Sequence, residues 1–219
     1  MSLGRQHSFW GSLSPLGGLT GAGLLIMASA RLSWAITIGL SLFWVYGLTA
    51  FIFSLLSSIL ANKFFPVSGR MSLYTCLAAF FGSIYLLMFW LLCPFAAWEV
   101  FILLLLVPLF CASSGIVQQI PVSGQSSHYD PFEHVSDAVS QAASLAILLL
   151  AFSIVREPLS FCSLTFPGTY QGMITIMYFS ENSFFPIGIF STSAGALLLL
   201  GYIICLYQYG KNQISPGDY

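Results

Sequence analysis

The sequence predicts an all-α integral membrane protein, because it is very apolar and carries few charges. Hydrophobic residues make up 58% of the chain and charged residues only 6%, and the mean hydropathy is +0.89. A water-soluble domain carries roughly 25% charged residues, so these few charges could not cover a soluble surface. The net charge of -1 gives no reason to expect a nucleic-acid partner. The expected partner of the surface is the lipid bilayer.

A helical span takes about 20 apolar residues, so 219 residues leave room for about six spans in a single membrane domain over residues 1–219. The apolar runs place these spans at Leu16–Ala30, Leu32–Ala61, Met71–Cys93, Val100–Ile120, Asp137–Val155 and Phe184–Tyr209. Between them the sequence predicts connections at Asn62–Arg70, Pro94–Glu99, Pro121–Ser136 and Arg156–Asn182. The connection at Pro94–Glu99 is expected to be a tight hairpin.

The first and fourth spans are irregular. Leu16–Ala30 is short and contains four glycines, and Val100–Ile120 contains Pro108 and the run Cys111–Gly115. Irregular backbone survives at membrane depth only where protein or a cavity covers it. Each irregular span opens a group of three, which predicts two repeats of three helices, at about 14–93 and 97–209, with the first helix of each repeat broken. Three spans per repeat is an odd number, so the repeats should be inverted in the membrane.

The charges give the expected orientation. With both termini in the cytoplasm, Arg5, Lys63, Arg70 and Lys211 lie inside. Arg31 and Arg156 then lie outside, and the positive-inside rule favours this arrangement by a small margin.

Cys111 is the one cysteine in a broken-helix context. One interpretation is a thiolate ligand to an iron–sulfur cluster or another soft metal. The alternative is a small, packed hydrophobic residue.

The remaining polar candidates lie near the fifth span. His128, Asp130, Glu133 and His134 resemble a metal cluster but also read as a solvated turn containing Pro131. Asp137 either caps that span or contributes to coupling or a partner contact. Arg156 and Glu157 close the span, either as an interfacial pair or as a gating or partner contact.

Several of these segments, in their order, resemble the Rnf/Nqr family of membrane subunits (the RnfA/RnfE and NqrD/NqrE type). The run Gly23–Leu32 (GLLIMASARL) resembles the first repeat, and Cys111–Gly115 (CASSG) resembles the cysteine motif of the second. Asp137 matches an aspartate before the fifth helix, and Ser153–Glu157 (SIVRE) matches an Arg-Glu signature. The segment from Phe185 to Gly201 is similar to the last span.

The resemblance implies a non-catalytic electron-transfer subunit in the bacterial cytoplasmic (inner) membrane. Such a subunit pairs with a paralogous six-helix subunit in inverted orientation and assembles with the other subunits of the complex. The pair shares a [2Fe-2S] cluster, and the complex couples electron flow from ferredoxin or NADH to Na⁺ or H⁺ translocation.

The sequence departs from the family pattern at the ligand positions. Gly23 stands where the first cysteine is expected, Phe110 replaces a polar residue, and Ile116 replaces a charged one. Either the partner or Cys93 supplies the missing ligand, or the cluster is absent.

Two other functions remain open. A small secondary transporter or channel also uses inverted repeats and broken helices, although the spans hold few central charges. The second alternative is a structural membrane protein without a cofactor.

Overall fold

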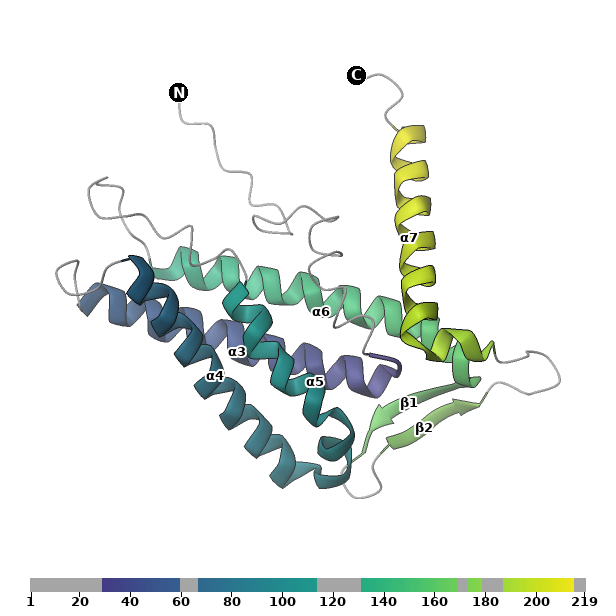
Figure 1. Ribbon diagram of the computed structural model, residues 1–219, viewed down its shortest axis with the longest axis horizontal. Helices are drawn as coiled ribbons and strands as arrows, with labels where there is room; N and C mark the ends of the chain where they lie inside the picture. Colours follow the sequence, from purple (N-terminus) through teal and green to yellow (C-terminus); the bar gives the residue numbers. More distant parts are fainter. Residues whose placement is uncertain (1–28, 60–66, 114–130, 169–172, 179–186, 215–219) are drawn as a thin grey trace.

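The computed structural model describes residues 29–59, 67–113, 131–168, 173–178 and 187–214. This part of the chain is mostly helical (Figure 1), with five α-helices and one short 3-10 helix. The α-helices are α3 (Leu32–Ile59), α4 (Val67–Leu92), α5 (Pro94–Ser113), α6 (Pro131–Phe161) and α7 (Ser193–Ile214). Three helical segments are long and apolar enough to cross a membrane: Leu32–Leu56, Ser72–Leu92 and Val135–Phe161.

These three segments correspond to the second, third and fifth expected spans. The apolar parts of α5 (Pro94–Leu109) and α7 (Ser193–Leu206) are shorter. At 1.5 Å per residue, the apolar part of α5 extends about 24 Å, less than the roughly 30 Å of a hydrocarbon core. The first expected span, Leu16–Ala30, lies almost entirely outside the described residues.

Helices α3 and α6 form the centre of the fold and lie side by side along its longest axis (Figure 1). A Cβ built on Gly39 would lie 3.3 Å from Ala146 Cβ, and one on Gly47 would lie 3.8 Å from Val139 Cγ2. The contact positions increase along α3 and decrease along α6, so the two helices are antiparallel. Small residues at such a contact let helix backbones approach closely.

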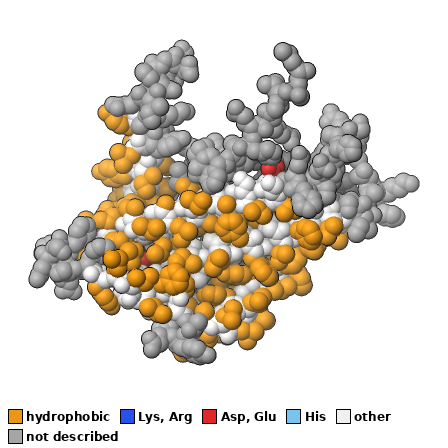
Figure 2. Space-filling view, turned by 180° about the vertical axis from the view of Figure 1, so that it is seen from behind, with side chains coloured by type: hydrophobic (Ala, Val, Ile, Leu, Met, Phe, Trp, Pro, Cys, Tyr) orange, Lys and Arg blue, Asp and Glu red, His pale blue; other side chains and the backbone are white. Residues whose placement is uncertain are grey.

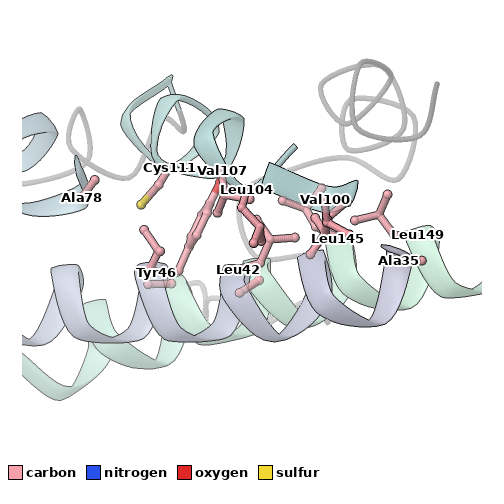
Figure 3. Packing of buried hydrophobic residues seen from close by; sticks show 14 of the residues in the cluster. Ala35, Leu42, Tyr46, Ala78, Val100, Leu104, Val107, Cys111, Leu145 and Leu149 are labelled. Atoms are coloured by element: carbon pink, nitrogen blue, oxygen red, sulfur yellow. The ribbon is translucent and has the colours of Figure 1, made fainter. Parts of the chain in front are cut away.

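Helices α4 and α5 pack against each other, and both contact α3. The two helices lie close together at Gly82, where an added Cβ would overlap the ring of Pro108. The side chains between α3, α5 and α6 form one apolar cluster, which includes Leu42, Leu104 and Leu149 (Figure 3).

The outer surface of this bundle is also apolar. Hydrophobic side chains cover much of the described part of one face (Figure 2), and Leu91 and Ile102 are among the most exposed apolar residues. A contiguous apolar surface of this extent is typical of a protein embedded in lipid or in a larger assembly.

The chain reverses direction between α4 and α5, as the expected hairpin requires, but Pro94–Glu99 is helical and the two helices are joined at Cys93. The backbone nitrogen of Cys93 still bonds to the Phe89 carbonyl, and Ala97 already bonds to the Cys93 carbonyl, each at 2.8 Å. Pro94 is therefore the first residue of α5, where its missing N–H leaves no helical hydrogen bond unmade.

The expected connection at Arg156–Asn182 is partly regular structure, so the described residues are not all α. α6 continues through Pro158 to Phe161. Strands β1 (Ser163–Pro167) and β2 (Met173–Tyr178) then pair antiparallel. The 3-10 helix η2 (Gly188–Ser191) contacts α6 and leads into α7, which extends away from the bundle (Figure 1).

Candidate functional site

Arg156 and Glu157 lie near the end of α6 and are fully buried, each with 0% of its surface exposed. A buried charge is costly unless hydrogen bonds or opposite charges compensate it. Both side chains therefore need partners, and the structure supplies them from segments that are distant in sequence.

The guanidinium of Arg156 binds backbone carbonyls from two segments. Its Nε donates to the Phe190 carbonyl at 2.7 Å, and its NH2 donates to the carbonyls of Ser191 and Thr192 at 3.1 Å each. Its NH1 donates to the Ser29 carbonyl at 3.0 Å. The rigid fork of the arginine side chain suits such a set of acceptors. Arg156 thereby fastens the junction of η2 and α7 to the residues that precede α3.

The carboxylate of Glu157 binds the beginning of α3. Its Oε2 accepts a hydrogen bond from the Leu32 backbone nitrogen at 2.8 Å, and its Oε1 accepts one from Thr165 Oγ1 at 2.6 Å. Thr165 Oγ1 also lies 3.2 Å from Ser33 Oγ. A carboxylate at a helix N-terminus satisfies a free backbone donor and is stabilised by the helix dipole. Glu157 therefore joins α6, β1 and α3.

The structure thus brings Arg156 and Glu157 together but directs them to different segments. Both side chains lie inside the protein. Their role in coupling or in a partner contact stays a prediction. Asp137 lies in the second turn of α6, because that helix begins at Pro131. The prediction that Asp137 caps the helix is therefore wrong, and its coupling role stays a prediction.

Cys111 lies in the last turn of α5 and is also fully buried (Figure 3). Its sulfur is 3.5 Å from Thr49 Oγ1 of α3 and 3.5 Å from the Tyr74 hydroxyl of α4. The Tyr74 ring is held edge-on against Phe53, with 5.4 Å between the ring centroids. The thiol therefore occupies a junction of three helices and has two hydroxyl neighbours, which the sequence analysis did not anticipate.

The described residues around Cys111 do not by themselves make a [2Fe-2S] site. Such a cluster takes four protein ligands. Within the described ranges, no group of three or more histidine, cysteine, aspartate or glutamate residues could hold a metal ion. Gly23, His128 and Asp130 lie outside these ranges, as do the side chains of Glu133 and His134.

A second cluster lies at the beginning of α3. We name it the Arg31 cluster, and it consists of Arg31, Trp34, Phe161 and Met173. The Arg31 Cζ atom is 5.1 Å from the Phe161 ring centroid and 6.0 Å from that of Trp34. Its NH1 donates to Met173 Sδ at 2.8 Å. The sequence analysis placed Arg31 outside the membrane but did not predict these neighbours.

Comparison of the chain with family models and with curated proteins found no match to either.

Proposed function

We propose that this chain is a membrane subunit of an Rnf/Nqr-type complex in a bacterial cytoplasmic membrane. In this proposal it is non-catalytic and pairs with a paralogous six-helix subunit in inverted orientation. It helps to build the path along which the complex couples ferredoxin or NADH oxidation to Na⁺ or H⁺ translocation. Its six spans form two inverted three-helix repeats.

The antiparallel contact of α3 and α6 is the observation that carries this proposal. These helices are the second and fifth expected spans, which are equivalent helices of the two proposed repeats. An inverted repeat relates equivalent helices by a two-fold axis in the membrane plane. Equivalent helices that meet at such an axis must be antiparallel. The contacts of Gly39 with Ala146 and of Gly47 with Val139 show this direction for α3 and α6.

The scaffolding form of the proposal fits the described residues best. A bound [2Fe-2S] cluster would supply one-electron transfer, and Cys111 would be the thiolate that this chain contributes. Because the described residues hold no group of three or more histidine, cysteine, aspartate or glutamate residues that could bind a metal, we derive no step through the cluster. Thr49 and Tyr74 hold the sulfur at a fixed place among the three helices.

The transporter alternative is less well supported by the polar groups of α3. Four of the buried hydroxyl side chains along this helix each donate to a carbonyl of their own preceding turn: Thr37 to Trp34, Ser41 to Ile38, Thr49 to Val45, and Ser54 to Phe51. Each of these four hydroxyls has its proton committed to the helix backbone, so none of them can donate it to an anionic substrate.

The test is an iron and acid-labile sulfide assay with low-temperature EPR, on the chain co-expressed with its genomic neighbours. Cys111→Ser is compared with Cys76→Ser and Cys205→Ser, whose exposed side chains make them matched controls. A reducible signal lost only in Cys111→Ser supports the electron-transfer form. A signal that persists in Cys111→Ser rules out this cysteine as a ligand.

Co-purification separates the remaining outcomes. An iron-free chain that purifies with a paralogous membrane subunit and flavoprotein partners supports the scaffolding form. An iron-free, folded chain that purifies alone contradicts the proposal and favours a transporter or a structural protein.

A further inference from the structure

We infer that the Arg31 cluster binds the phosphate of an anionic phospholipid headgroup. The inference starts from the position of the cluster. Arg31 directly precedes the apolar segment Leu32–Leu56, and Phe161 is the last residue of the segment Val135–Phe161. One segment that could span the membrane therefore begins where the other, antiparallel segment ends. That place is one membrane surface, where lipid phosphates are concentrated.

The aromatic residues at this end support the same position. Trp34 Nε1 lies 3.4 Å from Glu99 Oε2, near the beginning of α5. Trp98 is 74% exposed and packs edge-on against Trp90, near the end of the segment Ser72–Leu92. Tryptophan is enriched at membrane interfaces, where its ring is in apolar surroundings and its N–H remains hydrated.

The Arg31 guanidinium retains hydrogen-bonding capacity. Among the residues that the structure describes, Met173 Sδ is its one hydrogen-bond acceptor, and a thioether sulfur is a weak acceptor. No described carboxylate forms an ion pair with it. Glu99 bonds to Trp34, and Glu157 bonds to Leu32 and Thr165. Arginine presents five N–H donors in a fork that matches phosphate oxygens.

The neighbours of Arg31 fix the cation without neutralising it. Phe161 and Trp34 attract the guanidinium through their ring faces. An arginine that is already oriented loses less conformational entropy when it binds a ligand. An anion with an apolar tail fits this place, because Phe161 of the cluster exposes hydrophobic surface.

The test is native mass spectrometry of the full chain in detergent, titrated with phosphatidylglycerol. A diacylglycerol glycolipid without phosphate is the lipid control, and inorganic phosphate is the competitor. We expect the wild-type chain to retain phosphatidylglycerol and to bind the glycolipid weakly. Equal binding of the two lipids would overturn the inference. Displacement of phosphatidylglycerol by inorganic phosphate at equal concentration would also overturn it, since the site would then recognise a free anion.

Variants locate the site. Arg31→Gln should lower the affinity for phosphatidylglycerol by at least about tenfold, because it removes charge-assisted hydrogen bonds. Arg31→Lys keeps the charge but loses the fork, so it should retain only part of the affinity. Lys211→Gln is a control that removes a cation from α7. An unchanged affinity in a folded Arg31→Gln chain would assign binding to another site and overturn the inference. If Arg31→Gln does not fold, the comparison of the two lipids on the wild-type chain still decides the inference.

Discussion

The carboxylate of Glu157 accepts a 2.8 Å hydrogen bond from the backbone nitrogen of Leu32, so the end of α6 caps the beginning of α3. The two residues are 125 positions apart in the sequence. The antiparallel packing of α3 and α6 brings them together. This cap adds a polar, directional contact to an otherwise apolar helix pair, and it fixes the register of the two helices.

Replacement of Glu157 by alanine should lower the free energy of unfolding by about 2–4 kcal/mol, because it leaves the Leu32 N–H and the Thr165 hydroxyl without their buried acceptor. Glu157→Gln keeps one acceptor oxygen for the Leu32 N–H and turns an amide donor toward the Thr165 hydroxyl, which can rotate to accept it. It should lose about 1 kcal/mol, mainly the attraction between charge and helix dipole. Unfolding in detergent would measure both changes. An alanine variant as stable as the wild type would show that Glu157 is not a cap in the folded protein.

Arg156→Lys should destabilise the junction of η2 and α7. An ammonium group cannot reproduce the arginine fork, and the buried Ser29 carbonyl left without its donor costs about 1–3 kcal/mol. We expect lower thermal stability in detergent and faster chymotrypsin cleavage near Phe190. Ser191→Ala is the control, because alanine keeps the carbonyl that Arg156 binds. Equal cleavage rates in Arg156→Lys and the wild type would argue against this role.

Gly82→Ala should destabilise the protein by about 1–3 kcal/mol, because the new methyl group would overlap Pro108 and force α4 and α5 apart. Gly201→Ala is the matched control, since a Cβ there meets nothing within 4 Å. It should be neutral or slightly stabilising, because alanine favours a helix more than glycine does. Thermal unfolding of both variants would compare them. A Gly82→Ala variant no less stable than Gly201→Ala would contradict the close contact of α4 and α5.

Thiol labelling in detergent should follow exposure. A small maleimide is expected to modify Cys76 and Cys205, which are exposed, well before Cys111, which is enclosed by Thr49 and Tyr74. Mass spectrometry of peptides after timed labelling would measure the order. Thr49→Ala should open space beside the sulfur and accelerate labelling at Cys111. Labelling of Cys111 as fast as Cys76 in the folded wild type would contradict its burial.

The long apolar runs of the sequence predict the central helices well. The expected spans Leu32–Ala61 and Met71–Cys93 correspond to α3 and α4 within a few residues, and Asp137–Val155 lies within α6. Continuous apolar stretches of this length favour helices wherever the backbone must satisfy its own hydrogen bonds. The expected count of six spans and the inverted repeat stay predictions.

The short elements and the distant contacts were harder to predict. Proline usually ends a helix, yet Pro94 begins α5 and Pro158 lies within α6. The run Met173–Tyr178 contains the β-branched residues Ile174, Thr175 and Ile176, which could have indicated a strand. No local pattern could have shown that Glu157 would bind Leu32, because only tertiary packing places the two together.

The distance along the chain between Leu32 and Glu157 has a consequence for synthesis. The ribosome adds roughly 5–20 residues per second, so the partner of the Leu32 N–H is made roughly 6–25 seconds after Leu32 itself. During that interval the beginning of α3 lacks its cap, and Arg156 has not yet been made to bind the Ser29 carbonyl. The beginning of α3 is therefore completed only after the end of α6 has been made. A nascent chain stopped before Arg156 lacks both the Glu157 cap and the Arg156 contact to the Ser29 carbonyl.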